Sequence, residues 1–152
     1  MWKGLNTLAT LSSLSDDLDI SRQYRGLCAR ANMLRRNFFH CSNDVKTLLF
    51  KTYCTCLYTA HLWITYSVQI MNKFIVCYNN AFRWLMGYPK FCSASGMFVV
   101  NCVPSFGELR RRLVFNFMQR LVHSSNDLVT QLCDIQWCSP FWRKWDGLLF
   151  VR

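Results

Sequence analysis

Apolar residues recur along most of this chain at the alternating steps of three and four that place them on one face of an α-helix. The clearest such stripe consists of Ile20, Tyr24, Leu27, Ala31, Leu34 and Phe38. No segment sustains the strict alternation of apolar and polar residues that indicates a half-buried strand, and no internal repeat is present. The pattern predicts an all-α fold, a bundle of four to five helices.

Two capping signals predict an antiparallel αα-hairpin at the start of the bundle. We expect the first helix to begin at Asp16–Asp19, whose carboxylates can cap free N–H groups, and to continue to Phe38. Ser42 is expected to cap a second helix that continues to about Trp63. Because the connection over residues 39–41 is short, the two helices should lie side by side in opposite directions.

Further signals predict the remaining elements. Ser67 opens a third helix that stops before Gly87. The other expected elements are a helical turn at 95–100, a helix after the capping box Ser105–Glu108, and a short helix capped by Asn126–Asp127. The predicted organisation is a lead over residues 1–13, a helical domain over 14–132 and an aperiodic, Trp-rich tail over 133–152.

Composition bounds the partners of the chain. Its 152 residues are 52% hydrophobic and 16% aromatic, which excludes a disordered chain and supplies enough apolar material for one core. The 18 Lys and Arg against 8 Asp and Glu give a formal charge of +10, which favours a polyanionic partner such as nucleic acid or an anionic membrane surface. A basic, solvated surface is the alternative.

Cysteine usage favours an intracellular protein, nuclear or cytoplasmic and not secreted. The nine cysteines are odd in number, and no apolar signal segment follows Met1-Trp2-Lys3-Gly4. Five of the cysteines stand among apolar neighbours, where a free thiol behaves as a small hydrophobe. They are Cys28, Cys41, Cys77, Cys92 and Cys102.

A membrane-associated protein is one alternative. Residues 52–72 carry no formal charge and are about long enough to cross a bilayer as a helix. The same segment contains many hydroxyl and amide side chains, each of which would need a hydrogen-bonding partner in hydrocarbon. The sequence therefore disfavours a membrane span.

No constellation of residues predicts catalysis, a metal site or a cofactor. Asp16-Asp17 is the only adjacent acidic pair, no third carboxylate stands in a recognisable motif, and a helix N-cap is the preferred interpretation of the pair. The zinc candidates, Cys54 and Cys56 with His61 and Cys133 with Cys138, lack the two ligand pairs of a closed tetrahedral site. No nucleophile or phosphate-binding motif is found, so the chain is not expected to be an enzyme.

Basic residues interleaved with aromatic ones predict contacts with RNA or single-stranded DNA. Arginine pairs with phosphate and aromatic faces stack on unpaired bases. The candidate nucleic-acid-binding residues are Arg22, Arg25, Arg35, Arg36, Arg83, Lys90, Arg110, Arg111 and Arg112. On the predicted first helix, Arg30 also falls off the apolar stripe and is expected in solvent or on a partner. For any single residue, a solvated helix face is the competing interpretation.

Several segments, in order, resemble the reverse transcriptases of LINE-type, jockey-like non-LTR retrotransposons. They are Asp16–Gln23, Ala29–Phe38, Val45–Lys46, Leu49–Cys54, Leu57–Trp63, Val76–Arg83, Ser93–Val99, Phe117–Leu121 and Ser124–Asn126. The resemblance covers roughly residues 14–132 and leaves 1–10 and 136–152 unmatched. It implies the helical thumb and the region after it, which help to grip template and product.

In that family the RNA-directed DNA polymerase activity belongs to fingers and palm. The aromatic-x-Asp-Asp strand motif of the palm is not found in this chain, so the resemblance implies a noncatalytic, nucleic-acid-associated helical fragment. Two further alternatives stay open. One is a module that binds a protein partner or itself through exposed apolar surface, and the other is a decayed open reading frame without a selected function.

Overall fold

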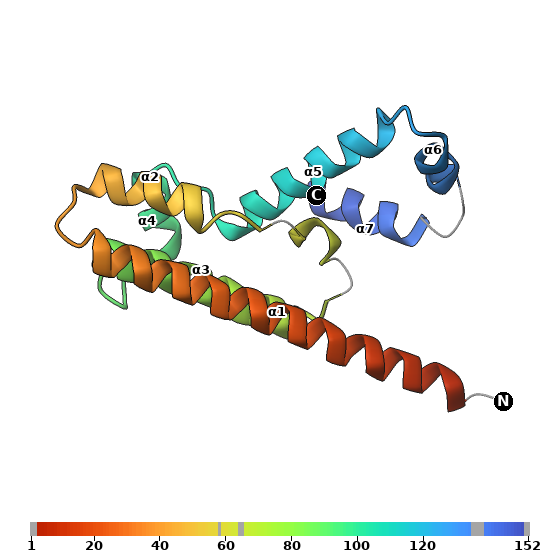
Figure 1. The fold of residues 1–152 in the computed structure, drawn as a ribbon, viewed down its shortest axis with the longest axis horizontal. Coiled ribbons are helices and arrows are strands. Elements are labelled where there is room, and N and C mark those ends of the chain that lie inside the picture. The colour runs from red at the N-terminus through yellow and green to blue at the C-terminus, as the bar shows by residue number, and fades with distance from the viewer. Residues whose placement is uncertain (1–2, 58, 64–65, 135–138, 151–152) are drawn as a thin grey trace. The chain divides into compact units, whose positions relative to one another are not determined.

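The computed structural model describes the backbone of residues 3–57, 59–63, 66–134 and 139–150, and side chains over 18–131 and 142–150 apart from residues 58, 64 and 65. Every regular element in these residues is helical, which confirms the predicted all-α class (Figure 1). The described residues form two compact units. Unit 1 contains α1 (Lys3–Asn37), α2 (Asn43–Tyr53), α3 (Val68–Met86) and α4 (Ala94–Val100), and unit 2 contains η1 (Ala60–Leu62), α5 (Phe106–Val122), α6 (Asp127–Asp134) and α7 (Ser139–Leu149).

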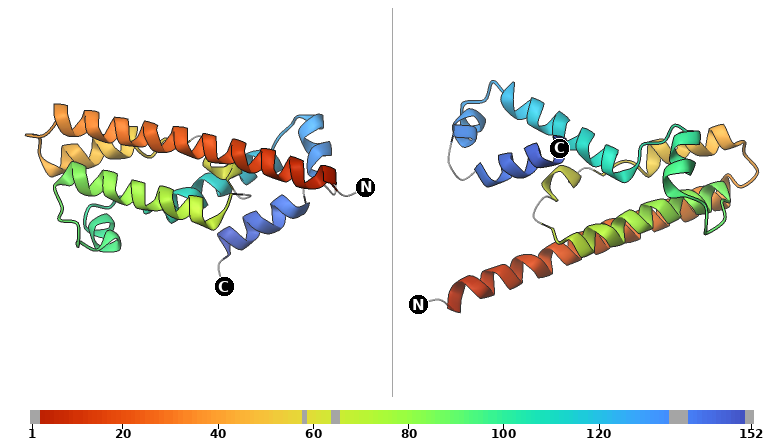
Figure 2. Two further views of the ribbon diagram at one scale, coloured as in Figure 1. Left: turned by 90° about the horizontal axis from the view of Figure 1, so that it is seen from below. Right: turned by 180° about the vertical axis from the view of Figure 1, so that it is seen from behind.

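Unit 1 is built on two parallel helices, α1 and α3. Cys28 lies opposite Cys77, and Arg35 lies over Trp84, so the two helices run in the same direction in constant register. α3 lies beside the C-terminal part of α1, while the N-terminal part of α1 extends beyond it (Figure 2). α2 doubles back after α1, as expected of an αα-hairpin, but the main partner of α1 is α3.

The core of unit 1 is a cluster of aromatic rings between α2, α3 and α4. Phe50 of α2 packs edge-on against Tyr78 and Phe82 of α3, at ring-centroid distances of 5.3 and 4.8 Å. Phe98 of α4 lies 5.2 Å from Phe82. All four rings are buried, and each such side chain contributes about 1.5–3 kcal/mol relative to exposure. The Tyr78 hydroxyl stays satisfied in this core by donating to the Pro104 carbonyl at 3.0 Å.

The first helix begins earlier than predicted. α1 starts at Lys3, so Asp16 and Asp17 lie within the helix and cannot be its N-cap. The capping signal was overridden by a periodicity that continues upstream, where leucines at positions 5, 8, 11, 14 and 18 are spaced by three or four residues. The side chains of residues 3–17 lie outside the described part of the structure.

The second helix ends ten residues earlier than predicted, at Tyr53 instead of Trp63. Side chains just beyond it donate back to carbonyls four residues earlier. Thr55 Oγ1 donates to the Lys51 carbonyl at 2.5 Å, and Cys56 Sγ donates to the Thr52 carbonyl at 2.9 Å. Such bonds satisfy carbonyls that a continuing helix would otherwise use, so the helix can stop without a glycine.

The other caps were predicted correctly. Ser67 accepts from the Ile70 N–H at the start of α3, and Gly87 ends that helix in the left-handed region at φ 76°. Ser105 and Glu108 form the capping box of α5, with the Ser105 N–H donating to Glu108 Oε2 at 2.8 Å. The hydrogen bond that the Ser105 N–H donates to the Glu108 carboxylate, followed by the Ser105 side chain, lowers the pKa of Glu108. The Asn126 side chain accepts from the Leu128 N–H at 3.0 Å and caps α6.

Unit 2 is held by a short 3₁₀ helix that packs on α5 and α7. The His61 ring of η1 stacks on Phe117 of α5 at 4.2 Å, and Trp145 of α7 donates to the His61 carbonyl at 3.0 Å. α7 corrects the expectation of an aperiodic tail over 133–152, because residues 139–149 form a helix. Trp142, Trp145 and Leu149 recur there at helical steps, and Trp145, which is 5% exposed, packs against Phe117 and donates to the His61 carbonyl.

Replacing Gly87 by alanine should destabilise unit 1, because the positive φ of this residue disfavours any Cβ. We expect a loss of about 1 kcal/mol in the free energy of unfolding, measured by urea titration. Gly96→Ala is the matched control. That residue lies inside α4 with only ordinary contacts for a Cβ, so alanine there should be neutral or stabilising. Equal losses in both variants would contradict this account.

Mild acid should weaken unit 2 through His61. Burial, followed by the nearby Arg120 charge, lowers the pKa of His61 below its usual value near 6.5. Below pH 6.5, His61 binds a proton in the unfolded chain but stays neutral in the folded chain. The free energy of unfolding therefore falls as the pH drops from 6.5 toward the lower pKa of the folded state. Urea midpoints at pH 7.5 and 5.5 should differ more for the natural chain than for His61→Phe, which keeps a ring against Phe117. An identical pH response would exclude His61 as the cause.

Candidate nucleic-acid interface

A groove follows the seam between α1 and α3 on one face of unit 1. Its larger section has a volume of about 730 Å³, and a smaller cavity of about 190 Å³ adjoins it through shared walls. The residues common to both are Tyr24, Lys73 and Val76. At the end of the smaller cavity stands Trp84. The groove is therefore continuous over about four turns of α3, from Gln69 to Trp84.

The side chains of the groove are basic and aromatic. Tyr24 and Trp84 are 43% and 54% exposed, so each presents part of a ring to solvent. Arg25 and Lys73 supply positive charge, and no acidic residue is among those that line either section. Tyr24 belongs to the predicted apolar stripe, yet it stands at the edge of the helix contact, whereas Leu27 is fully buried.

The cations of the groove have free donors. Arg25 uses its Nε to bond the Ser21 carbonyl at 3.2 Å, which orients the guanidinium along α1 and leaves both Nη groups for a ligand. Lys73 is exposed and forms no ion pair with any described residue. An anionic chain lying in the groove would therefore meet two positive charges without displacing an internal salt bridge.

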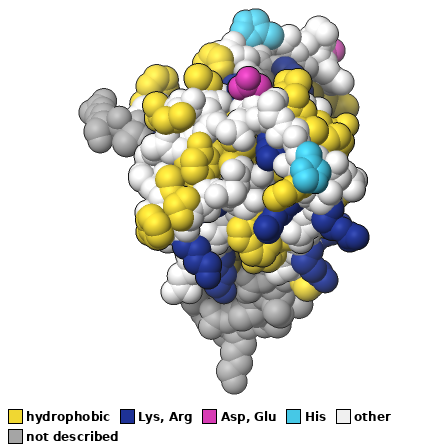
Figure 3. All heavy atoms as spheres, turned by 90° about the vertical axis from the view of Figure 1, so that its left-hand side faces the viewer, with side chains coloured by type: hydrophobic (Ala, Val, Ile, Leu, Met, Phe, Trp, Pro, Cys, Tyr) yellow, Lys and Arg dark blue, Asp and Glu magenta, His cyan; other side chains and the backbone are white. Residues whose placement is uncertain are grey.

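Arg35 and Arg36 extend the basic surface at the end of α1. The Arg35 guanidinium lies 6.0 Å from the centre of the Trp84 ring, a cation–π distance that links this charge to the groove. Arg35 and Arg36 also line a shallow hollow of about 520 Å³ with Asn32 and Phe39. On the face of the molecule where α1 ends, Lys and Arg side chains are intermixed with hydrophobic ones (Figure 3).

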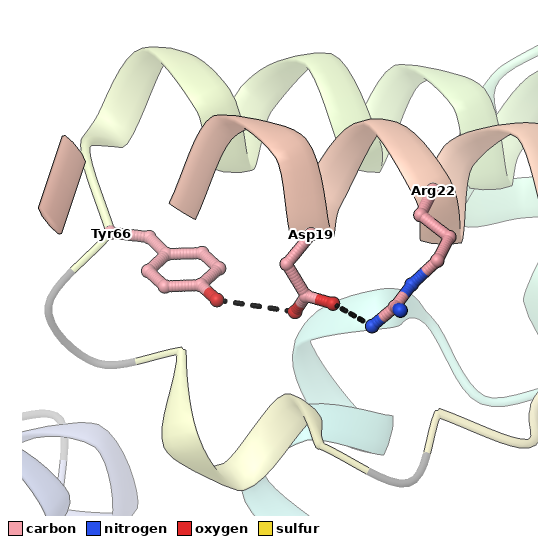
Figure 4. Close-up of polar contacts among 3 residues, drawn as sticks. All are labelled: Asp19, Arg22 and Tyr66. Atoms are coloured by element: carbon pink, nitrogen blue, oxygen red, sulfur yellow. Dashed lines mark hydrogen bonds and ion pairs between the residues drawn. The ribbon is translucent and has the colours of Figure 1, made fainter. Parts of the chain in front are cut away.

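Arg22 is neutralised within α1. Its Nη2 lies 2.8 Å from Asp19 Oδ1, and the other carboxylate oxygen of Asp19 accepts from the Tyr66 hydroxyl at 3.2 Å. Both side chains point at the same carboxylate from neighbouring segments of unit 1 (Figure 4). Arg22 is one turn from Arg25, so the two arginines differ mainly in having or lacking an acidic partner.

Two of the predicted binding residues hold the fold together. Arg83 donates through Nε and Nη2 to the Cys92 carbonyl at 3.3 and 3.0 Å, and through Nη1 to Asn80 at 2.9 Å. These bonds fasten the loop between α3 and α4. In unit 2, Arg110 donates to the Trp63 carbonyl at 2.9 Å, and burial lowers its pKa. Neither guanidinium is presented freely to a partner.

The remaining predicted residues are exposed and are not among those that line the groove. Lys90 stands in the loop between α3 and α4, and Arg111 and Arg112 stand on the surface of α5 in unit 2. Arg30 departs from the expectation that it faces solvent. Its Nε and Nη2 are buried without a hydrogen-bond partner, and its Nη1 lies 3.3 Å from where a Cβ on Gly26 would be. The glycine one turn earlier makes the room for this folded-back guanidinium.

Lys73 and Tyr24 line the groove but were not predicted from the sequence as binding residues. Lys73 lies between the predicted helical positions Ile70 and Phe74 and carries no motif. Tyr24 was assigned to the core. Its hydroxyl pKa is raised, chiefly by the neighbouring Cys28 and Cys77 thiols and then by burial. The amphipathic character of tyrosine at a stripe edge is the one signal that points to partial exposure.

Among the described side chains, no group of three His, Cys, Asp or Glu residues could hold a metal ion. The three zinc candidates that are described have different environments. Cys54 is buried, Cys56 is exposed, and the His61 ring stacks on Phe117. Burial raises the pKa of Cys54 to about 12. Cys133, Cys138 and the side chains of Asp16 and Asp17 lie outside the part described.

The segment 52–72, considered for a membrane span, is not one helix. It contains the end of α2, the short η1 and the start of α3. Within the described residues, none of the helices combines the length and the apolar character needed to cross a bilayer.

Comparisons with protein families, with curated proteins and with solved structures find no match for this chain.

Alanine substitution should lower the free energy of unfolding at Arg83 but hardly change it at Arg36. Arg83→Ala removes three hydrogen bonds and leaves the Cys92 carbonyl without its donor, so we expect a loss of about 1–3 kcal/mol in unfolding free energy. Arg36→Ala, at an exposed site on α1, should stay within about 0.5 kcal/mol. Chemical denaturation compares the two. A neutral Arg83→Ala would mean that the loop does not depend on this residue.

Proposed function

We propose that unit 1 binds single-stranded nucleic acid, RNA or single-stranded DNA, along the α1–α3 groove. The observation that carries the proposal is that exposed aromatic rings and basic side chains without acidic partners line one continuous groove. The rings are Tyr24 and Trp84, and the basic residues are Arg25 and Lys73. Proteins that hold single strands without reading their sequence combine these two elements. A positive groove follows the backbone, and aromatic faces stack on successive bases.

Each side chain has a distinct task in this binding mode. The Nη groups of Arg25 and the Lys73 ammonium contact phosphates, because both groups are exposed and free of acidic partners. The Trp84 ring stacks on a base, with the Arg35 guanidinium 6.0 Å from its centre adding positive charge beside the same base. A duplex keeps its bases stacked inside, so the rings favour unpaired strands over double helices.

The family resemblance suggests the origin of this activity. Two of the segments that resemble the retrotransposon reverse transcriptases, Ala29–Phe38 and Val76–Arg83, contribute to the walls of the groove. We infer a noncatalytic helical domain derived from the thumb and post-thumb region of such an enzyme, which grips a template or product strand. The support for this origin is the sequence resemblance together with an all-helical, basic structure.

Fluorescence anisotropy with labelled oligouridine over a salt series tests the function. With three cations at the groove, Arg25, Lys73 and Arg35, the logarithm of the association constant should fall with the logarithm of salt with a slope of about −2. Trp84→Ala should weaken binding by about 1–3 kcal/mol, the range for loss of one stacked base. No measurable affinity at low salt would exclude the proposal.

Arg25→Gln and Arg22→Gln form a matched pair for the same assay. Both remove one charge from α1, one turn apart, but Arg22 is already paired with Asp19. We expect Arg25→Gln to reduce the magnitude of the salt slope by roughly 0.7 and Arg22→Gln to leave it nearly unchanged. Equal effects would show that binding follows overall charge and not the groove.

A protein-binding or self-associating module is the second candidate. Large apolar side chains stand exposed near α4: Phe91 is 92%, Val99 75% and Val100 77% exposed. Exposed apolar groups that gather in one region are typical of interaction surfaces. If self-association is the function, sedimentation velocity will show dimers at micromolar concentration, and Val99→Ser with Val100→Ser will shift them to monomers.

A further inference from the structure

Two cysteine thiols face each other across the parallel helices. Cys28 Sγ on α1 and Cys77 Sγ on α3 lie 3.5 Å apart. The α1–α3 register puts them at the same level, and the neighbouring seam residues Ala31 and Ala81 are small, so the two backbones approach closely there. A disulfide bond is about 2 Å long, so a modest side-chain movement would join the two sulfur atoms.

The two thiols differ in their access to solvent. Cys28 is partly exposed, whereas Cys77 is buried, and both line the cavity of about 190 Å³. A cavity of this size holds several water molecules, so a small oxidant can reach Cys28. Burial and the hydrogen bond with Cys28 raise the pKa of Cys77 to about 12, which keeps that thiol protonated. Other described cysteines lack such a partner; Cys56, for example, donates to a backbone carbonyl.

We propose that Cys28 and Cys77 are a modification site, a thiol pair that hydrogen peroxide converts into a disulfide joining α1 to α3. The Cys28 thiolate attacks a peroxide oxygen, the O–O bond breaks, and a sulfenic acid and hydroxide form; the hydroxide takes up a proton to give water. The Cys77 sulfur then attacks the sulfenic sulfur, its proton leaves with the hydroxyl group as a second water, and the S–S bond forms. In sum, two thiols and one peroxide give one disulfide and two waters. An excess of dithiol reverses the reaction.

The disulfide closes a long loop between the two helices that form the frame of unit 1. Cross-linking residues far apart in sequence restricts the unfolded chain and raises the stability of the folded one. The same bond fixes the walls of the groove next to Tyr24 and Trp84, which line the same cavity. The inference does not depend on nucleic-acid binding, because it concerns only the bond and its effect on stability.

Peptide mapping of the whole chain tests the proposal without any substitution. The reduced protein is treated with hydrogen peroxide at low concentration, free thiols are alkylated, and the tryptic digest is analysed by mass spectrometry. Cleavage at arginine and lysine places Cys28 in Gly26–Arg30 and Cys77 in Phe74–Arg83, each as the only cysteine of its peptide. We expect these two peptides to be joined, and to separate after dithiothreitol. Recovery of both thiols alkylated, or equal linkage to other cysteines, would overturn the proposal.

Variants test the consequence for stability. Oxidation should raise the melting temperature of the natural chain on the order of 5 °C. Cys28→Ser and Cys77→Ser should show no increase, whereas Cys56→Ser, at an exposed cysteine outside the pair, should respond like the natural chain. A full increase in Cys28→Ser would also overturn the proposal, since another bond would then be responsible.

Discussion

The parallel packing of α1 on α3 is the constraint on which unit 1 depends. Two consecutive helices with a tight turn can only be antiparallel, so parallel neighbours require the chain to travel back along their length before the second one starts. α3 has 19 residues and is about 28 Å long, whereas the 11 residues of α2 cover only about 16 Å. The remainder of the return needs a more extended chain. This geometric need agrees with the early end of α2 at Tyr53 and with the side-chain bonds of Thr55 and Cys56 that satisfy the last carbonyls of the helix.

The same packing produces the groove and the thiol pair. Small residues at the seam, such as Ala31 and Ala81, let the helices approach, and the longer side chains are displaced to the edge of the contact. Tyr24 and Trp84 are therefore half-exposed, and the Cys28 and Cys77 thiols contact each other in the cavity that these rings also line. Exposed rings and contacting thiols are thus two results of one register. A shift of α3 by one turn, about 5 Å, would separate the thiols.

How far the sequence predicted the structure depended on whether a feature is local. The caps at Ser67 and Ser105 and the stop at Gly87 were correct, because each depends on a few adjacent residues. Other features depend on contacts distant in sequence. The partner of α1, for example, lies about fifty residues away. α7 does carry a local signal that the prediction of an aperiodic tail missed, since Trp142, Trp145 and Leu149 recur at steps of three and four.

The candidate site shows the same division. Basic residues could be counted from the sequence, but not all of their partners could be predicted. The spacing of three residues between Asp19 and Arg22 is the spacing of a helical ion pair, which distinguishes Arg22 from Arg25. Nothing near Arg83 in the sequence shows that it bonds the Cys92 carbonyl. The sequence places Tyr24 on the apolar stripe of the first helix and therefore predicts that it is buried. Helical spacing does not show where the contact between α1 and α3 ends, and Tyr24 lies at its exposed edge.

The distribution of charge also limits what the proposed groove can do. A formal charge of +10 favours strong attraction to polyanions, but several guanidinium groups are committed within the fold or buried, as with Arg110 and Arg30. Few cations then remain at the groove, so in the proposed binding mode electrostatic attraction would contribute modestly and salt would weaken it gently. Stacking on Tyr24 and Trp84 would supply the rest, and stacking tolerates any base. Under this proposal the groove would hold a strand without selecting it by sequence, as a gripping domain does.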